Sequence, residues 1–426
     1  MRLICGINDR RVGALTDLGA GRIGFSYDEG WYADWVRGAA HPISLSLRPS
    51  SPDEVLDATA YVAGLLPDNP HHRDMLAREL DLGDSPTDFE LISRIGRDSA
   101  GALTITPEGD TGRGPEAPSV EWLTEAGLAE HLRSLPRRPL LLDDEHGVML
   151  SLAGVNDKAA VVVSRGRIGL PRHGAPSTHI IKVDIPRLTG SVLTEHFCLR
   201  LAKAAGLRVP HSRIHRAEDQ AFMLMARYDR VLTPAGVTRV HQEDFCQALG
   251  LSPARKYERR GGPGWAECLS LAANTSHPAA ARDEMVRWAA LQFLIGNPDA
   301  HAKNYSLLYD PGSSGVRLAP LYDLNNGPAF RASFKSVSPK MAMSIGDQAD
   351  PERVGPQEWA RFSQTAGLDP RVVASAVAET ASRLLAALPI AQAECPGCEA
   401  VSLAAEDVRA RCEAWVGIDH AGPELG

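Results

Sequence analysis

The feature that most limits the fold is a change in apolar spacing along the chain. Up to about residue 240, short apolar runs and period-two alternation dominate, and both patterns are typical of strands. From about Gln242 the spacing becomes helical. Within residues 282–296, the spacing of a buried helix face is shared by Val286, Ala289, Ala290, Phe293 and Leu294. This order predicts an α+β fold with a mostly helical carboxy-terminal part.

The first hundred residues open with expected strands. Residues 2–7, 22–27 and 42–47 have strand patterns, and Ile43, Leu45 and Leu47 share one face of the third. Residues 51–66 and 71–82 are expected helices, the first with Ser51 and Pro52 as its cap and first-turn pair. Residues 106–119 are rich in Gly and Pro and have no apolar period, which predicts a linker.

Strand patterns continue after the linker. Residues 146–170 predict a strand, a loop, a second strand and a hairpin, and residues 177–185 predict another strand. A helix is expected over residues 191–207, ended by Gly206, and a hairpin over residues 212–230 with its turn at 217–220. A strand-rich region, a helix, more strands and a helical remainder are the order of a two-lobed protein-kinase-like fold.

Length and composition restrict the class of protein. A chain of 426 residues predicts two or three domains, and 44% apolar with 23% charged residues is typical of globular proteins. Seven scattered cysteines argue against a disulfide framework. No uninterrupted apolar run reaches about eighteen residues, and the amino terminus lacks a signal-peptide pattern, so we expect a cytoplasmic protein. The net charge of -8 disfavours direct nucleic-acid binding, so a DNA role would need a partner.

Three polar residues in loop-like settings match the chemistry of phosphoryl transfer. Kinases place a catalytic Asp and a metal-binding Asn five residues apart and a metal-binding Asp further on. Asp299 and Asn304 have that spacing, and Asp323 follows in "LYDLNNG". Carboxylate and amide oxygens suit a hard cation such as Mg²⁺. Each Asp taken alone could equally be a turn or helix-capping residue, whereas the ordered set favours a kinase.

The upstream half supplies candidate phosphate ligands. Lys182 lies on an expected strand between apolar residues, where it either meets the nucleotide phosphates or protects an exposed sheet edge. Glu195, on the following helix, could pair with Lys182 as the corresponding kinase residues do, or could lie on a solvated face. The polar loop that starts at Ser151 and contains Gly154 could hold phosphates or could be a simple hairpin turn.

Together, these motifs resemble the HipA family of bacterial serine/threonine kinase toxins. The motifs "SLAGVNDKAAVV", "HIIKVDI", "EHFCLRLAKAAGLRVP", "HQEDFCQALGL", "KYERRGGPG", "NPDAHAKNYSLL" and "LAPLYDL" occur in the family's order. "PISLSL" and "LISRIGRDSAGAL" resemble the domain that precedes the kinase. The resemblance covers nearly the whole chain. It implies an amino-terminal domain over residues 1–107, a kinase N-lobe-like region over 120–240 and a helical C-lobe over 241–426.

The resemblance also implies roles for individual residues. Ser151 matches the autophosphorylated serine, Asp299 the catalytic base, and Asn304 and Asp323 the metal ligands. The expected ATP-binding set is Ala153, Gly154, Val155, Asn156, Asp157, Lys158, Lys182, Tyr228 and His301. His301 and Lys303 have no defined role in the catalytic motif. Ala226 replaces an acidic residue common in the family, and the lone C-x-x-C at Cys395 and Cys398 is interpreted as incidental.

The expected function follows from both arguments. The residues themselves indicate an Mg²⁺- and ATP-dependent phosphotransferase. The resemblance adds a toxin that phosphorylates a translation component such as an aminoacyl-tRNA synthetase, and a DNA-binding, HipB-like antitoxin as partner, with DNA contacted only through it and no membrane partner. Two alternatives stay open at this point: an inactive co-repressor with the antitoxin, and a small-molecule phosphotransferase.

Overall fold

The computed structural model describes residues 1–109, 118–135, 158–186, 188–234, 236–335 and 337–416. The chain forms two compact units. Unit 1 comprises Met1–Val183, Arg213–Ala254 and Ser306–Ala319, and unit 2 comprises Asp184–Ser212, Arg255–Tyr305 and Pro320–Gly426. Unit 1 holds the sheets and unit 2 is mainly helical, which confirms the expected α+β class and its helical carboxy-terminal part. The domain limits inferred from the sequence stay predictions.

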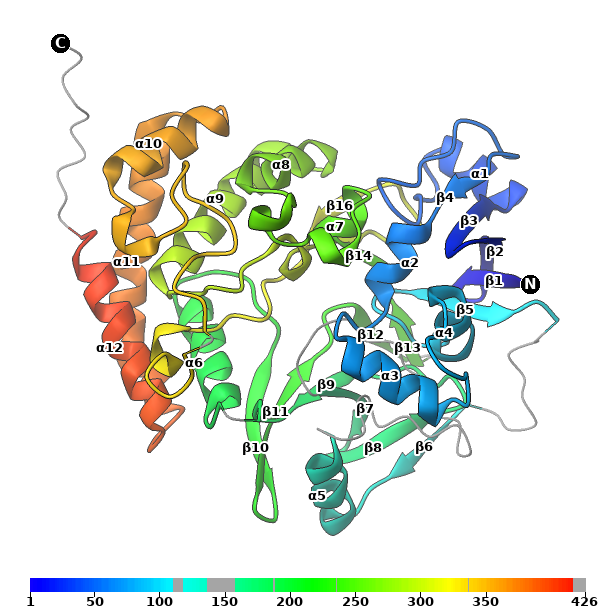
Figure 1. Ribbon diagram of the computed structural model, residues 1–426, viewed down its shortest axis with the longest axis horizontal. Coiled ribbons are helices and arrows are strands. Elements are labelled where there is room, and N and C mark those ends of the chain that lie inside the picture. Colours follow the sequence, from blue (N-terminus) through cyan, green and yellow to red (C-terminus); the bar gives the residue numbers. More distant parts are fainter. Residues whose placement is uncertain (110–117, 136–157, 187, 235, 336, 417–426) are drawn as a thin grey trace. The chain divides into compact units, whose positions relative to one another are not determined.

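Unit 1 begins with a five-stranded sheet of order β4-β3-β2-β1-β5 (Figure 1). Its strands are β1 (Arg2–Ile7), β2 (Arg10–Gly19), β3 (Arg22–Tyr27), β4 (Leu56–Asp57) and β5 (Leu103–Pro107). Four helices accompany it: α1 (Glu29–Val36), α2 (Thr59–Leu65), α3 (Pro70–Glu79) and α4 (Asp88–Ile95). The helix α4 starts with a capping box in which Thr87 and Glu90 satisfy each other's backbone N–H groups.

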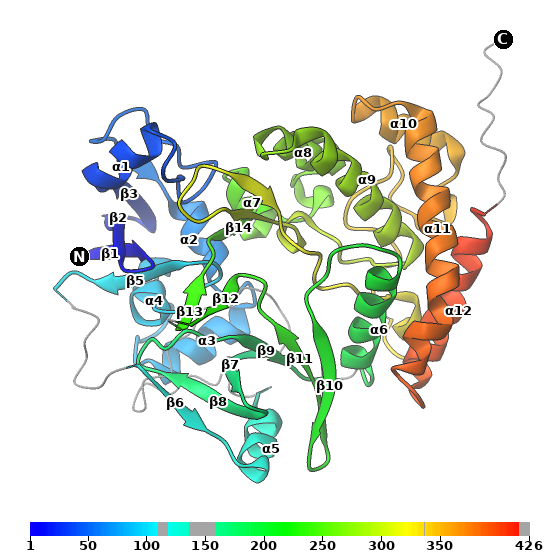
Figure 2. The same cartoon turned by 180° about the vertical axis from the view of Figure 1, so that it is seen from behind.

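A six-stranded sheet of order β10-β11-β9-β7-β8-β6 follows (Figure 2). Its strands are β6 (Ser119–Trp122), β7 (Lys158–Ser164), β8 (Arg167–Arg172), β9 (His179–Lys182), β10 (Ser212–Ala217) and β11 (Gln220–Ala226), and α5 (Glu125–Ser134) contacts β11. The smaller elements are β12 (Arg230–Thr233), β13 (Gly236–Arg239), β14 (Gln242–Asp244), α7 (Phe245–Ala248), β15 (Ser306–Tyr309) and β16 (Val316–Leu318). One buried apolar cluster, extending from Leu3 to Leu224, joins the two large sheets.

The predictions for two elements of unit 1 are wrong. Residues 42–47 form no strand, although Ile43 and Leu47 are buried, because Leu45 N–H donates to the Glu243 carboxylate and not to a neighbouring strand. The helix expected over 51–66 starts only at Thr59. Leu56 instead pairs with Phe25 at the sheet edge as part of β4, a long-range contact that local spacing does not reveal.

The other expected elements that fall on described residues form where the sequence predicts them. The strands at 2–7 and 22–27, the hairpin of β7 and β8, the strand β9 and the hairpin of β10 and β11 all form where they were expected. The helix α6 (Ser191–Ala204) ends before Gly206, whose positive φ of +89° suits a helix terminus. The expected linker at 106–119 falls largely on residues 110–117, which lie outside the described residues.

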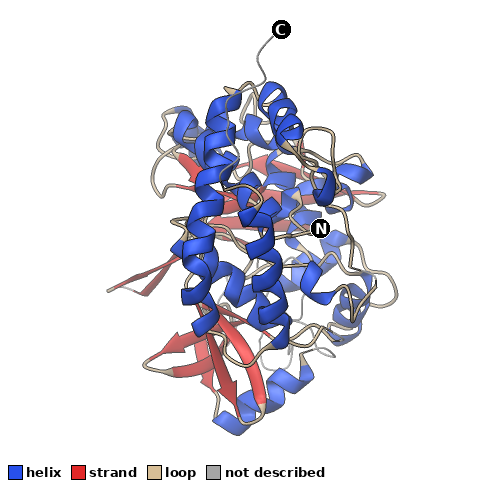
Figure 3. Cartoon of the chain, turned by 90° about the vertical axis from the view of Figure 1, so that its left-hand side faces the viewer, coloured by secondary structure: helices blue, strands red, loops and turns tan. Residues whose placement is uncertain are grey.

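Unit 2 contains α6, α8 (Trp265–Ser270), α9 (Pro278–Leu294), α10 (Pro356–Thr365), α11 (Pro370–Ala393) and α12 (Glu399–Glu413). All five residues expected on the buried face of α9 are buried. The helix α11 contacts α6, α9, α10 and α12, and Figure 3 shows α11 and α12 side by side.

The helix α11 is long and apolar enough to cross a membrane by length and composition. Its buried residues recur at helical spacing, from Val373 and Val377 to Leu384 and Leu388, and this face packs against neighbouring helices. The opposite face includes exposed charged residues such as Glu379 and Arg383. This pattern is that of a core helix in a helical unit.

Candidate active site

The loop that carries Asp299 begins where α9 ends. Gly296 adopts a left-handed backbone with φ +64°, and a Cβ there would lie 2.9 Å from the Asp407 carboxylate, so glycine is required for this turn. Asn297 then returns to the helix, because its backbone N–H donates to Gln292 O and its side-chain Nδ2 to Gln292 Oε1. The direction in which the loop leaves the helix is therefore fixed.

Asn297 also joins the two loops that hold the candidate catalytic and metal residues. Its Oδ1 accepts from the backbone N–H of Asp299 over 3.1 Å, and its Nδ2 donates to the backbone carbonyl of Asp323 over 3.3 Å. Asn304 closes the first loop, since its Nδ2 donates to the carbonyl of Asp299 over 2.8 Å. The structure thus joins the loop that carries Asp299 and Asn304 to the loop that carries Asp323. These two loops are separate features of the sequence.

Further hydrogen bonds fasten the second loop to the first. The Tyr322 hydroxyl donates to Lys303 O over 3.0 Å, and Asn326 Nδ2 donates to Ile295 O over 2.9 Å. Asp323 itself has a positive φ of +53°, a conformation that Asp and Asn adopt more readily than other non-glycine residues. The roles of Asn297 and Asn326 were missed by sequence reasoning, although both lie inside the quoted motifs.

The carboxylate of Asp299 points to a polar, basic neighbourhood. Its side chain is 53% exposed and accepts a hydrogen bond from the Tyr257 hydroxyl. The buried ring of His301 lies edge-on to Tyr257, 4.8 Å between ring centroids, with its Nε2 3.9 Å from Asp299 Oδ1. Burial and the nearby Asp299 carboxylate raise the pKa of Tyr257, so its hydroxyl stays a proton donor at neutral pH.

Basic side chains surround the same tyrosine. Lys256, Arg259 and Arg260 place their charges 5.5, 4.6 and 5.4 Å from the centre of the Tyr257 ring. Cations at this range are attracted to the ring face. The motif "KYERRGGPG" therefore supplies positive potential beside Asp299, where phosphates and a phosphate-accepting group would meet.

The two candidate metal ligands have the donor chemistry that Mg²⁺ requires. Asn304 uses its Nδ2 as a donor to Asp299 O, which leaves Oδ1 as its ligand atom, and Asp323 contributes a carboxylate. Mg²⁺ in phosphotransferases commonly takes one or two protein oxygens together with phosphate oxygens and water. In the described part of the chain, no group of three or more His, Cys, Asp or Glu side chains forms a metal site. The amide oxygen of Asn304 and the carboxylate of Asp323 are of the donor types that such a cation takes.

Two lysines of unit 1 face each other on neighbouring strands. Lys158 and Lys182 are opposite partners on β7 and β9, and both are buried. Burial of an ammonium group is costly unless a polar or charged partner accompanies it, and the expected role of both lysines in ATP binding stays a prediction. Because β9 lies between β11 and β7, Lys182 is not on a sheet edge, and the edge-protection alternative is wrong.

The remaining candidates have different outcomes. Glu195 is buried on α6, so its solvated-face alternative is wrong, and its pairing with Lys182 stays a prediction. Tyr228 is partly buried and packs against an apolar cluster of Val240, Leu308 and Ala319. The other members of the expected phosphate loop lie outside the described residues, namely Ser151, Ala153, Gly154, Val155, Asn156 and Asp157.

Two other features stand apart from the site. Cys395 and Cys398 flank a turn before α12, and none of the seven cysteines forms a disulfide.

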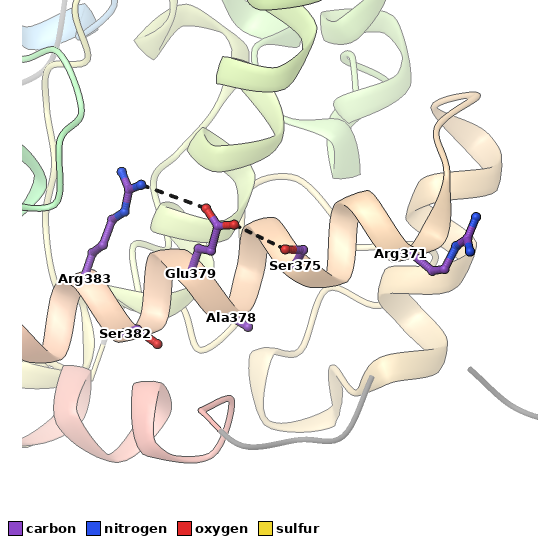
Figure 4. Close-up of a pocket in the computed structure, with 6 residues that line it drawn as sticks. All are labelled: Arg371, Ser375, Ala378, Glu379, Ser382 and Arg383. Atoms are coloured by element: carbon purple, nitrogen blue, oxygen red, sulfur yellow. Dashed lines mark hydrogen bonds and ion pairs between the residues drawn. The ribbon is translucent and has the colours of Figure 1, made fainter. Parts of the chain in front are cut away.

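A surface hollow along α11 is shown in Figure 4, where Glu379 lies between Ser375 and Arg383. No residue that lines this hollow belongs to the candidate site.

Two family models match separate parts of the chain. The HipA-like C-terminal domain matches residues 150–388, more than half of the chain, and the HipA N-terminal domain matches residues 3–106. The chain belongs to the HipA family. A putative kinase of Sinorhizobium fredii is 39% identical to this HipA-family chain over 367 residues, which is 84% of each chain. The serine/threonine-protein kinase toxin HipA of Shewanella oneidensis is 29% identical over 388 residues, 87% of this chain and 86% of the relative.

A solved structure supports the same assignment. The chain resembles a chain in the structure of the Shewanella oneidensis toxin–antitoxin system HipA, HipB and its operator DNA, with a TM-score of 0.83, 27% identity and 97% coverage of both chains. The expected kinase-like α+β fold and the expected enzyme class, a serine/threonine kinase of the HipA type, are confirmed.

Proposed function

We propose that this HipA-family chain is an Mg²⁺- and ATP-dependent serine/threonine protein kinase that acts as the toxin of a toxin–antitoxin pair. The observation that carries the proposal is the position of Asn297, which binds the backbones of both Asp299 and Asp323. A base and a metal ligand held by one shared side chain provide the fixed geometry on which phosphoryl transfer depends.

Each residue has a distinct task in this proposal. Asp299 accepts a hydrogen bond from the acceptor hydroxyl and orients it, a role for which its half-exposed carboxylate is accessible. Lys158 and Lys182 hold the nucleotide phosphates, and Asn304 and Asp323 hold the cation. When bound, Mg²⁺ neutralises charge on the phosphate oxygens.

Ser151 is the proposed site of autophosphorylation, as the family resemblance implies. A phosphate there adds a charge of about -1.5 to -2 at the start of the loop that would hold ATP. We expect the loop to bind nucleotide less well after modification, because phosphate groups repel each other. Mass spectrometry after incubation with Mg²⁺-ATP should find phosphate at Ser151, and the modified fraction should bind ATP more weakly. Equal ATP affinity of both fractions would contradict the regulatory role.

The partner and the substrate class are inferred from relatives. A HipB-like, DNA-binding antitoxin is the proposed partner, supported by the HipA–HipB–operator complex of Shewanella oneidensis. Contact with DNA through this partner alone is compatible with the net charge of -8. An aminoacyl-tRNA synthetase is the proposed substrate, and the cytoplasm, without a membrane partner, is the proposed location.

One experiment separates this function from the two alternatives. The purified chain is incubated with labelled ATP and Mg²⁺, with and without cell extract, and Asp299→Asn serves as the inactive control. Labelled protein bands support a protein kinase. Label in small molecules alone would identify a small-molecule phosphotransferase, and no label at all would indicate a binding-only co-repressor.

A further inference from the structure

In unit 1, the two ends of the segment 227–247, namely residues 227–230 and 239–247, form hydrogen bonds with the amino-terminal part of the chain. The segment follows β11 and contains β12, β13, β14 and the first residues of α7. Tyr228, a member of the expected ATP-binding set, lies near its start. Some of its contacts come from residues more than 100 positions away in the sequence and others from Gly174, Ser177 and the strand β15, all within unit 1.

A buried network of five charged side chains holds the start of the segment. It consists of Asp98 from the amino-terminal part and of Arg227, Asp229, Arg230 and Arg239. Arg230 donates to Asp98 over 2.7 Å and Arg239 over 3.2 Å. Arg227 donates to both carboxylate oxygens of Asp229, over 2.9 and 2.7 Å. The side chains of Asp98, Asp229, Arg227 and Arg230 are at most 3% exposed.

Backbone groups of the amino-terminal part also bind this network, as does Ser177, whose hydroxyl donates to Asp98 over 2.7 Å and accepts from Arg227 over 2.9 Å. The carbonyl of Ser99 accepts from Arg227 over 2.9 Å, and the carbonyl of Gly101 accepts from Arg230 over 2.8 Å. The N–H of Gly101 donates to Asp229 over 2.7 Å. A Cβ on Gly101 would lie 2.7 Å from the backbone nitrogen of Gln242, so the two backbones approach as closely as glycine permits.

The charged groups of this network balance one another only when Asp98 of the amino-terminal part lies against the arginines of the 227–247 segment. Burial on its own would raise the pKa of Asp98, but Arg230, Arg227 and Arg239 outweigh it and hold this pKa below its usual value. In the same way, Arg227 and Arg230 overcome the effect of burial on Asp229 and lower its pKa to about 2. Loss of one partner from a buried network is strongly destabilising, because the others remain charged and out of water.

Two further sets of contacts hold the middle and the end of the segment. The side chain of Asn8 donates to Arg239 O over 2.8 Å and accepts from Arg239 N over 3.1 Å. Ile43 O lies 2.8 Å from His241 Nε2, and Leu45 N–H donates to Glu243 over 2.9 Å.

The "PISLSL" motif thus binds the "HQEDFCQALGL" motif. The hydroxyl of Ser44 donates to the Glu243 carboxylate, and that of Ser46 donates to Gln247 O over 2.7 Å. At the end of the segment, Gln247 Nε2 donates to Tyr61 O over 3.0 Å. Each of these contacts joins a residue of the amino-terminal part to the "HQEDFCQALGL" motif.

We propose that the amino-terminal domain positions the 227–247 segment and, through it, Tyr228, a member of the expected ATP-binding set. Arg227 and Asp229 flank Tyr228 in the chain, and their side chains are fixed by Asp98, Ser99 and Gly101. In this proposal, Asp98 and Asn8 act as positioning residues through Arg227, Arg230 and Arg239. The effect on nucleotide binding rests on the proposed function, whereas the effect on the order of the segment does not.

Two variants of the full-length chain test this proposal. Asp98→Asn keeps the size of the side chain and removes the charge that three arginines face. Asn8→Gly removes only the two bonds to Arg239, because glycine readily keeps the positive φ of +45° found at Asn8. The matched controls are Asp88→Asn, which breaks an ion pair with Arg73 inside the amino-terminal part, and Asp9→Gly, the next residue, with φ +67°.

Hydrogen exchange measured by mass spectrometry and ATP titration are the two readouts. Exchange across residues 227–247 should accelerate about a hundredfold or more in Asp98→Asn and about tenfold in Asn8→Gly, with α9 and both controls unchanged. ATP affinity should fall more in Asp98→Asn than in Asn8→Gly, while turnover at saturating ATP should change less than affinity. KM for ATP should therefore respond more than kcat.

The outcomes are distinct. Unchanged exchange over 227–247 in Asn8→Gly and in folded Asp98→Asn would overturn the positioning role. Faster exchange with unchanged ATP affinity would overturn the link to nucleotide binding. A parent chain that does not bind ATP would contradict the proposed function instead, and the exchange data would still decide whether the amino-terminal domain orders the segment.

Discussion

Replacing Glu243 by Gln should change how the stability of unit 1 depends on pH. Glu243 is buried and accepts hydrogen bonds from the Ser44 and Tyr309 hydroxyls and from Leu45 N–H. Burial raises its pKa from 4.5 to about 7, even though these three donors act in the opposite direction. The folded state therefore favours the protonated carboxyl, which Gln imitates in shape and charge.

The size of the effect follows from that pKa. Because the folded-state pKa is the higher one, the stabilising contribution of Glu243 is complete below pH 4.5 and is lost as pH rises through about 7. The rise in pKa corresponds to about 3 kcal/mol of unfolding free energy at about 1.4 kcal/mol per pKa unit.

The difference in unfolding free energy between Glu243→Gln and the parent chain isolates the contribution of Glu243 from those of its neighbours. Burial and His41 lower the pKa of His241 to about 3, which gives the opposite slope below pH 6.5. This contribution of His241 to the pH dependence of stability is present in both chains and cancels in the difference. The unfolding free energy of Glu243→Gln, minus that of the parent, should stay constant below about pH 4.5 and rise by about 3 kcal/mol by about pH 8.

Urea unfolding in buffers from about pH 4 to about pH 8 measures this difference. Glu130→Gln, at an exposed position of α5 in the same unit, is the control and should show no such rise. A difference for Glu243→Gln that is flat, or that falls with increasing pH, would refute the reasoning.

Three other substitutions test the candidate site. Asp299→Asn should lower turnover by about 10²–10⁴-fold while ATP binding and melting temperature hardly change, because the carboxylate is half exposed; near-normal turnover would remove Asp299 from the role of base. Asp323→Ala should weaken ATP binding in calorimetry at limiting Mg²⁺, and unchanged affinity would argue against a metal ligand. Gly296→Ala should reduce unfolding free energy by about 1–3 kcal/mol. It should cost more than Gly367→Ala, which shares its positive φ but has open space around it, and equal costs would exclude the clash with Asp407.

Much of the fold could be predicted because it depends on local patterns. Helix α9 formed where its apolar spacing placed it, and Gly206 followed the end of α6. Residues 42–47 show the limit of this reasoning. Their alternation matches a strand, yet Leu45 N–H binds the carboxylate of Glu243, about 200 residues away, and no neighbouring strand.

The candidate site also has features that the sequence reveals and one that depends on tertiary packing. The five-residue spacing of Asp299 and Asn304 and the later Asp323 are visible in the sequence, because one short loop sets the first pair. The bridge through Asn297 is not visible, because it depends on two loops that meet only after α9 and the following segment have packed.

By itself, the sequence determined the type of many elements, the family motifs and the chemistry of the candidate residues. These properties follow from side-chain spacing and residue type, which act over a few positions. Only the tertiary structure decided that β9 is interior, that Lys158 and Lys182 face each other, and that Asp98 holds Arg230. Strand order and buried ion networks join residues far apart in the chain, so they are fixed by packing and burial and not by any local pattern.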